Sequence, residues 1–162
     1  NLSNLFFSYG ELRNSKKISS AIADARKSSE ITTTSELVYV VENLVPEKFR
    51  NKFLSKVFQS IRIEVNDEMS SLEEMLLSAQ ELLKVNGRLV VLSYHSLEDR
   101  LVKNLIRKGN FSSEVQKDFF GNPIRNLKEI NKKVIVASAS EIRNNSRARS
   151  AKLRIASKIN DN

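Results

Sequence analysis

The sequence predicts an α/β protein with a helical first part and a second part in which helices and strands alternate. Along the first half, apolar residues recur every three or four positions, which is the period of an amphipathic helix. The pattern changes after an Asn-Gly pair, because residues 88–94 form a β-branched apolar run with helical segments on both sides. Helix, strand and helix in succession are typical of a parallel sheet covered by helices. The 162 residues suffice for one domain or for parts of two.

Two helices are expected at the start of the chain. Gly10 is expected to end the first, because glycine favours the position just past a helix C-terminus. The second is expected over residues 11–27, where apolar side chains recur at helical spacing. Arg13, Lys16 and Lys17 fall on the opposite side of this helix and form a basic face.

Further helices are expected before residue 85. Thr33 and Glu36 have the spacing of a capping box, and they would begin a short helix that Pro46 ends. Residues 54–83 carry the strongest period, which predicts one long amphipathic helix or two helices with a bend near residues 62–66. The apolar stripe of this segment consists of Leu54, Phe58, Ile61, Val65, Met69, Leu72, Leu76, Ala79 and Leu83. A neighbouring polar stripe, formed by Gln59, Arg62 and Asn66, fits either a solvated boundary or the lining of a cleft.

The second half is expected to contain the sheet. Strand 88–94 lacks polar alternation, so both of its faces are expected to be covered. Ser96 is expected to cap the helix over residues 97–108. Residues 109–131 show no clear period and predict a long loop. The last expected strands, paired as an antiparallel hairpin at the sheet edge, cover residues 133–137 and 151–156.

The charge favours a polyanionic partner. Lys and Arg number 27 against 19 for Asp and Glu, which gives a net charge of +8 and a pI near 9.8. Such an excess binds RNA or DNA through release of counterions, although a merely soluble basic surface has the same composition. The basic residues gather in two segments, residues 11–27 and 141–154.

Composition also excludes several classes of protein. There are no cysteines, which excludes disulfides and thiolate metal sites and favours a cytoplasmic location. His95 is the only histidine, so no cluster of histidines can bind a metal. The longest apolar run, residues 37–41, is far shorter than the roughly 20 residues that cross a bilayer. The four glycines are at least twelve residues apart, so they form no glycine-rich phosphate or dinucleotide loop.

Two segments are candidates for function. Ser93, His95 and Ser96 lie where strand 88–94 ends and a helix begins, which is where open α/β sheets bind ligands. The alternative is structural: Ser96 caps the helix and His95 packs in the core. The second candidate is residues 144–154, whose arginines, lysine, asparagines and serines suit contacts with phosphate and sugar. A solvated basic loop is the alternative there.

Four segments, in this order, closely resemble the MraW family: SYGELRNSKKISSAI, FQSIRIEVNDEMSSLEEML, NGRLVVLSYHSLEDRLVK and RARSAKLRIASK. Members of that family use S-adenosylmethionine to methylate N4 of a cytosine in 16S rRNA. Their Rossmann-like methyltransferase domain is interrupted by a helical substrate-recognition domain. The resemblance implies that residues 1–57 are part of this insertion and residues 58–162 are the C-terminal part of the methyltransferase domain. The first four strands and the main cofactor site would then be absent, and this chain alone would be inactive.

The resemblance also implies roles for single residues. Asn66, Ser93 and His95 would contact the target base as catalytic residues, and Ser96 is the one candidate for a cofactor contact. Tyr94 stands where the family usually has Phe, and Asn145-Ser146 stands where it usually has Asn-Pro. The residues expected to bind RNA are Arg13, Lys16, Lys17, Arg62, Arg147, Arg149, Lys152 and Arg154.

The partner implied is 16S rRNA in the small ribosomal subunit, with no metal and no membrane. The unpaired edge of half a sheet could also support self-association. The alternative function is a non-catalytic, basic module for RNA binding or ribosome assembly. That alternative rests on the charge of the chain and needs no cofactor.

Overall fold

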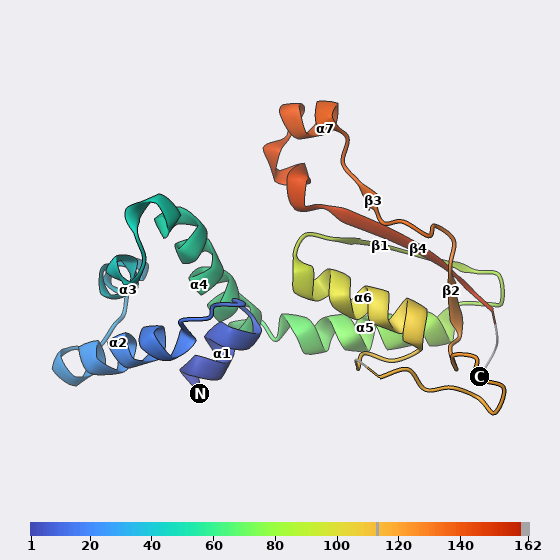
Figure 1. The fold of residues 1–162 in the computed structure, drawn as a ribbon, viewed down its shortest axis with the longest axis horizontal. Coiled ribbons are helices and arrows are strands. Elements are labelled where there is room, and N and C mark those ends of the chain that lie inside the picture. The colour runs from blue at the N-terminus through green and yellow to red at the C-terminus, as the bar shows by residue number, and fades with distance from the viewer. Residues whose placement is uncertain (113, 160–162) are drawn as a thin grey trace. The chain divides into compact units, whose positions relative to one another are not determined.

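The computed structural model describes residues 1–112 and 114–159 (Figure 1). Residues 113 and 160–162 lie outside the described residues; all of them belong to the predicted second domain, and residue 113 belongs to the predicted long loop. None of the described helices is both long and apolar enough to span a membrane.

The chain folds into two compact units, Asn1–Glu68 and Met69–Asn162. The first is helical and the second contains the sheet, which agrees with the expected α/β class. The predicted boundary between residues 57 and 58 lies inside helix α4 (Arg50–Val65), whereas the units divide after that helix has ended. The assignment of the two units to an inserted domain and a methyltransferase domain stays a prediction.

The first unit contains the helices that the sequence predicts, with shifted ends. The capping box is confirmed: Glu36 N donates to Thr33 Oγ1 at 3.2 Å, and Thr33 N donates to Glu36 Oε2 at 2.9 Å. The second helix begins later than predicted, since Glu11 has a positive φ of 50° that no α-helix accommodates. The helices before α4 are α1 (Leu2–Ser8), α2 (Ser15–Ser28) and α3 (Thr34–Val41), followed by 3₁₀ turns at Glu42–Leu44 and Glu47–Phe49.

The buried face of α4 differs from the predicted apolar stripe. Phe53 and Val57 enter the core with Phe6, Ile18, Ile22 and Val41, whereas Val65 of the predicted stripe is 77% exposed. Both rows are apolar at helical spacing, so packing against α1 and α2 decides which of them is buried. Gly10 allows this packing, because a Cβ there would lie 2.5 Å from Ser60 Oγ on α4. Gly10 does follow the end of α1, as expected, and its φ is not positive, so its role there is close approach.

The long periodic segment forms two helices, which is one of the two expected alternatives. Helix α4 ends at Val65 and α5 (Glu68–Leu82) follows directly. Between them Asp67 has a φ of 49°, which interrupts the helix. Arg62 then binds the carboxylate of Glu68 across the break, at 2.7 Å and 3.1 Å.

The sheet of the second unit is antiparallel, which corrects the predicted parallel sheet. Strand β4 (Lys152–Lys158) lies between β1 (Arg88–Ser93) and β2 (Leu127–Glu129), and β3 (Ile135–Val136) also pairs with it. Every pairing among the described strands is antiparallel. Both β1 and β2 run opposite to β4, so they point the same way without being neighbours. The predicted hairpin of the last two strands is confirmed, but β4 is central rather than at the edge.

Helices cover one face of this sheet. Leu76 of α5 and Leu105 of α6 (Ser96–Lys108) pack with Leu89, Leu127 and Ala156 of the strands, as Figure 1 shows for the helices. On the opposite face, Val90 is 56% exposed and Leu92 is 50% exposed. The prediction that strand 88–94 is covered on both faces is therefore wrong for the described residues. The predicted loop 109–131 is also interrupted, because it contains β2.

A charged pair ties α6 to the central strand. The guanidinium of Arg154 on β4 donates to both oxygens of Asp99, at 2.7 Å and 3.2 Å, and Lys152 donates at 3.3 Å. The side chains of Asp99 and Arg154 are each only 11% exposed. Burial raises the pKa of Asp99, but the hydrogen bonds and charges of Arg154 and Lys152 lower it further, so its pKa lies below the ordinary value. Arg154 also lies 3.9 Å from Glu129 on β2.

We expect Asp99→Asn to destabilise the second unit. The substitution keeps the shape of the side chain but removes the hydrogen-bonded counter-charge of the buried Arg154, which leaves only Glu129 at 3.9 Å. The free energy of unfolding should fall by about 3 kcal/mol, the lower end for breaking a buried ion pair. Urea denaturation followed by circular dichroism measures this. The control is Asp24→Asn, which breaks the exposed Asp24–Lys27 pair and should cost under about 0.5 kcal/mol. Equal losses in both variants would contradict a structural role for Asp99.

Candidate functional site

The candidate residues Ser93 and His95 lie at the carboxyl end of β1, as predicted. Ser93 is buried, and its hydroxyl donates to the backbone oxygen of Lys152 at 3.3 Å. His95 is the residue before α6. The structure therefore brings two of the three predicted catalytic residues into one short segment. The third, Asn66, belongs to the other unit, where its amide donates to Glu68 at 3.3 Å.

His95 caps α6, which corrects the assignment of Ser96 as the cap. His95 Nδ1 accepts the hydrogen bond from Glu98 N at 3.4 Å, and Glu98 Oε2 accepts from the backbone N–H groups of Tyr94 and His95 at 2.8 Å and 3.1 Å. An imidazole nitrogen with a free lone pair can replace the hydroxyl that usually caps a helix. Ser96 is the first residue of the helix instead. The backbone N–H groups of Tyr94 and His95, at the strand end where a ligand was expected, thus already bind the carboxylate of Glu98.

The second ring nitrogen of His95 is buried and makes no hydrogen bond within the described residues. The side chain is 11% exposed, and Nε2 lies 3.3 Å from Glu98 Oε1 without hydrogen-bond geometry. Since Nδ1 accepts a hydrogen bond, the proton of the neutral ring is on Nε2. His95 therefore offers a donor, held in place by its own capping contact, at the end of β1.

This arrangement favours the ionised form of the Glu98 carboxyl. Burial raises the pKa of its carboxyl, but the side chain of His95 and the backbone N–H groups of Tyr94 and His95 outweigh that effect. The net result is a pKa of about 2, below the ordinary value of 4.5. A carboxylate near the first turn also interacts favourably with the helix dipole. Glu98 thus holds the backbone at the end of β1 in one conformation.

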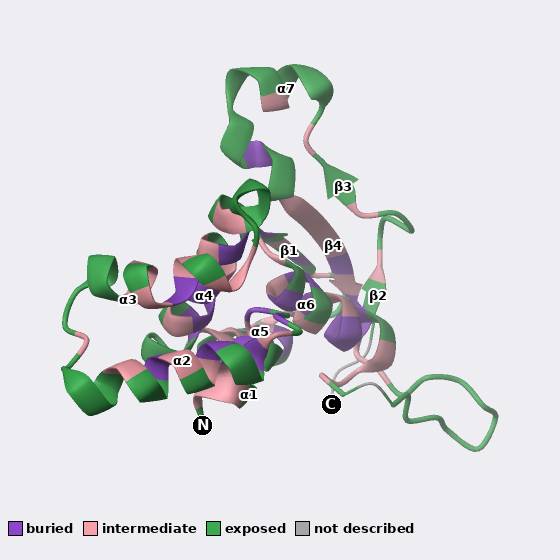
Figure 2. Cartoon of the chain, turned by 60° about the vertical axis from the view of Figure 1, so that its left-hand side comes forward, coloured by how far each residue is buried: buried purple, intermediate pink, exposed green. Residues whose placement is uncertain are grey.

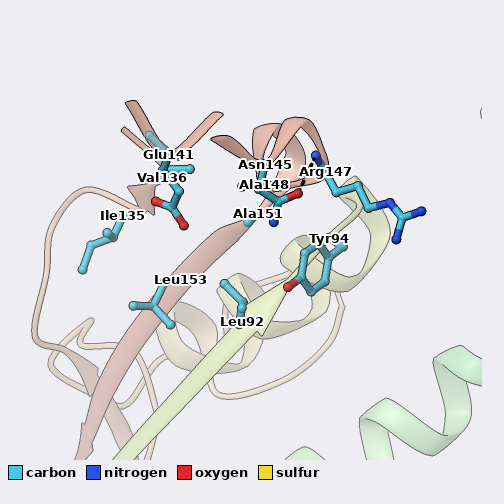
Figure 3. A pocket seen from close by; sticks show the side chains of 11 residues that line it. Leu92, Tyr94, Ile135, Val136, Glu141, Asn145, Arg147, Ala148, Ala151 and Leu153 are labelled. Carbon is cyan, nitrogen blue, oxygen red and sulfur yellow. Dashed lines mark hydrogen bonds between the residues drawn. The ribbon is translucent and has the colours of Figure 1, made fainter. Parts of the chain in front are cut away.

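A cavity of about 480 Å³ adjoins this segment (Figure 3). Leu92, Leu153, Ile135 and Val136 give it an apolar lining. Its polar groups are Tyr94, Glu141 and Asn145, and the backbone of Arg147, which also lines the cavity, donates to Asn145 Oδ1 at 3.1 Å. Glu141 and Asn145 come from α7 (Ala139–Asn144) and the residue after it, and Arg147 from the 3₁₀ turn Ser146–Ser150. A cavity that combines an apolar lining with a few polar groups has the general character of a small-molecule site.

Sequence reasoning identified the segments of this cavity but not all of its residues. Tyr94 lines it, although the sequence marks Tyr94 only as a departure from the usual Phe. Glu141 was not predicted, because a lone exposed carboxylate in a helix carries no sequence signal. The predicted residues Ser93, His95 and Ser96 do not line the cavity. Ser93 points to the other face of β1 from Leu92, whereas His95 caps α6 and Ser96 begins it. His95 and Tyr94 thus face different surroundings.

The residues predicted to bind RNA divide into free and paired groups. Arg13, Lys16 and Lys17 are exposed on and before α2, and Arg147 and Arg149 are exposed beside the cavity. The remaining three are held by carboxylates: Arg62 by Glu68, and Lys152 and Arg154 by Asp99. The burial of Arg154 does not favour the RNA contact predicted for it. Charge density along the sequence cannot separate the two groups, since the carboxylates are contributed by other segments.

The described residues do not form a complete site for a nucleotide-like cofactor. Among residues 1–112 and 114–159, no three His, Asp or Glu side chains are arranged to hold a metal ion. The only glycines with positive φ, among the residues described, are Gly109 and Gly121, and neither lies at the end of a strand. The cavity beside Tyr94 presents one carboxylate and no glycine-rich turn. The residues present could therefore contact polar groups of a ligand, but they do not form the whole binding site of a nucleotide-like cofactor.

Comparison with known proteins agrees with the sequence resemblance. The model of the MraW methylase family matches residues 1–159, and the chain belongs to this family. Two relatives, each named ribosomal RNA small subunit methyltransferase H, are those of Phocaeicola vulgatus and Bacteroides thetaiotaomicron. Each is 51% identical over 157 residues, which are 97% of this chain and 52% of the relative. The protein of that name from Flavobacterium johnsoniae is 51% identical over 158 residues. The chain thus spans about half the length of the curated relatives it matches.

We expect Glu98→Gln to change how stability depends on pH. Because the pKa of Glu98 is lowered to about 2 in the fold, its charge stabilises the protein above pH 4.5, and this contribution disappears as the pH falls toward 2. The variant keeps an acceptor for the capping contact but removes the charge. It should be less stable by about 1 kcal/mol at pH 7, and the difference should vanish near pH 2. Urea titrations from pH 7 to 2 measure this, with exposed Glu74→Gln as the control. A difference that is independent of pH would refute the role of the charge.

Proposed function

We propose that this chain is the C-terminal part of an S-adenosylmethionine-dependent methyltransferase that methylates N4 of a cytosine in 16S rRNA. One observation carries the proposal. Two of the segments that resemble the family, residues 86–103 and 147–158, pair as β1 and β4, and both contribute side chains to one cavity. The names of the relatives support rRNA as the substrate. The identity of the base and of the methyl donor rests on the family alone.

The sheet supports the view that further strands complete a Rossmann-like domain. Among the described strands, β1 pairs only with β4, so its second edge presents unpaired N–H and C=O groups. Val90 and Leu92 on the uncovered face are about half exposed. Strands from the rest of the protein, half the length of the relatives, would pair with this edge and bury this face. A cytoplasmic location and self-association stay predictions.

The residues of this chain would act on the base. The lone pair of a cytosine N4 is delocalised into the ring, so methylation requires the base to be held in place and one N4 hydrogen to be accepted. His95 holds a buried Nε2–H with no hydrogen-bond partner among the described residues, and this donor would suit a ring acceptor of the base. The oxygen of Ser93 is a candidate to accept the N4 hydrogen, whereas Asn66 belongs to the other unit and its role stays a prediction. This chain has no glycine-rich turn that could bind the methyl donor of the family, so none of these residues is assigned to binding the donor.

The exposed basic residues would bind the RNA backbone. Arg13, Lys16 and Lys17 in the first unit and Arg147 and Arg149 in the second have no carboxylate partner among the ion pairs of the described residues. Arg147 lies at the cavity, so phosphates next to the target base would meet it. The same residues would serve a non-catalytic RNA-binding module, which is the second candidate function. A measurement of methyl transfer distinguishes the methyltransferase from the non-catalytic RNA-binding module.

We expect His95→Asn to abolish most methyl transfer without unfolding the protein. Asparagine also caps helices, so α6 should keep its N-terminus, while the Nε2–H donor is removed. The test joins the N-terminal half of the Bacteroides thetaiotaomicron relative to residues 1–162 and measures incorporation of labelled methyl groups into 16S rRNA. The rate should fall about tenfold or more, with little change in melting temperature. Full activity in His95→Asn would make His95 a capping residue only. An inactive but RNA-binding parent protein would favour the second candidate.

We expect Arg147→Glu combined with Arg149→Glu to weaken RNA binding by the chain. Each phosphate that is no longer neutralised lowers the slope of log K against log salt by about one, so the slope should fall by about two. Fluorescence anisotropy with a labelled fragment of 16S rRNA at several salt concentrations measures this. The control, Lys48→Glu with Lys52→Glu, makes the same charge change at exposed residues of the first unit. If both variants weaken binding equally, net charge rather than a local interaction explains the binding.

A further inference from the structure

The segment between α6 and β2 contains an ordered turn, residues 116–124, which we name the aromatic turn. Its two arms are closed by hydrogen bonds from Asp118 N to Asn122 O and from Ile124 N to Gln116 O, both 2.9 Å. The carboxylate of Asp118 accepts from the backbone N–H groups of Phe120 and Asn122, at 2.9 Å and 2.8 Å. Gly121 has a φ of 86°, which favours glycine at this position. The turn is therefore held by its own hydrogen bonds.

Two phenylalanines form the tip of this turn. Phe119 is 98% exposed and Phe120 is 85% exposed, and their ring centroids are 5.7 Å apart at an interplanar angle of 87°. Figure 2 shows the segment as an exposed loop that extends from the second unit. Single exposed apolar residues are common on protein surfaces. The two adjacent rings at the end of this turn stand edge to face, and most of their surface is open to solvent.

The surroundings of the turn are basic. Residues 107–128 contain five basic and two acidic side chains. One of the acidic residues, Asp118, is occupied by the backbone of the turn, which lowers its pKa, chiefly through the N–H of Asn122. Lys117 lies within the turn and Lys128 on β2, four residues after it, and both are exposed. Aromatic faces with lysines beside them are the combination that binds single-stranded nucleic acid.

The turn lies far from the cavity within the second unit. Helix α6 begins at the carboxyl end of β1, beside the cavity, and its 13 residues run back to the other end of the sheet (Figure 1). At 1.5 Å per residue this is about 20 Å. A base that stacks on the turn is therefore not the base in the cavity. Stacking there would add affinity without taking part in the reaction.

We propose that the aromatic turn binds an unpaired RNA base by stacking on Phe119 or Phe120, as a second contact remote from the cavity. This inference rests on the proposed function, since rRNA is the source of the RNA. A protein surface or an anionic membrane could also receive aromatic side chains. The basic neighbours and the rRNA named for the relatives favour RNA.

The first test substitutes both rings, Phe119→Ala with Phe120→Ala, in the 162-residue chain. The probe is a labelled single-stranded RNA of mixed sequence, compared with the same RNA fully paired as a duplex. Affinity for the single strand should fall about tenfold, because one base no longer stacks, while the salt slope stays unchanged. Affinity for the duplex should not change. The control Phe7→Ala removes a ring that is 63% exposed on α1, and it should leave single-strand binding as it is.

The second test uses the absence of tryptophan from the chain. In Phe119→Trp the new indole is the only tryptophan, so its fluorescence reports on this position alone. Stacking on a base should quench it when single-stranded RNA is added, whereas duplex RNA and vesicles of anionic phospholipid should not change it. A blue shift with vesicles and no quenching by RNA would overturn the proposal in favour of a membrane contact.

Other outcomes separate this proposal from the proposed function. If the unsubstituted chain binds RNA and the double alanine variant binds it equally well, the aromatic turn has no role and the proposed function stands. If the unsubstituted chain binds neither RNA probe, both fail. If the double variant binds less tightly and with a smaller salt slope, the substitution acts on phosphate binding and stacking is refuted.

Discussion

The pairing of β4 with its neighbours is the interaction on which the second unit depends. This strand lies between β1 and β2 and also pairs with β3, so every described strand of the sheet contacts it. The register places Arg154 opposite Val91, from where its guanidinium reaches the buried carboxylate of Asp99 on α6. Hydrogen bonds hold the strand and a buried ion pair holds the helix against it. Removing either would leave unpaired polar groups in the interior, which is costly.

This pairing also creates the candidate site. Strand β4 runs opposite to β1, so the residues before β4 lie at the carboxyl end of β1. Arg147 and Asn145 therefore meet Tyr94 although about fifty positions separate them in the sequence. The same segment contains His95, which holds the start of α6 and keeps its second nitrogen buried. His95 thus lies next to the cavity in the sequence, although its side chain holds the start of α6 and does not line the cavity.

The basic residues show how one residue type serves two purposes. Arg147, Arg149 and Arg154 stand close together in the sequence and look alike as candidates for phosphate contacts. Only the first two are exposed, since Arg154 meets a carboxylate contributed by another helix. The net charge of the chain therefore overstates the charge available to RNA. The exposed rings of the aromatic turn add an interaction that charge counting does not detect.

Features that depend on neighbouring residues could be predicted from the sequence, whereas contacts between distant segments could not. The capping box at Thr33, the apolar face of α6 and the α/β class follow from the spacing and type of neighbouring residues, and the sequence determined them by itself. Three features were decided only by the tertiary structure. They are the antiparallel position of β4 between two strands, the buried face of α4, and the capping of α6 by His95 and not by Ser96. The physical reason is that the first two depend on residues distant in the sequence. The position of β4 depends on the strands that pair with it, and the buried face of α4 depends on a glycine that permits close packing. The cap depends on where β1 ends, and pairing with β4 sets that point.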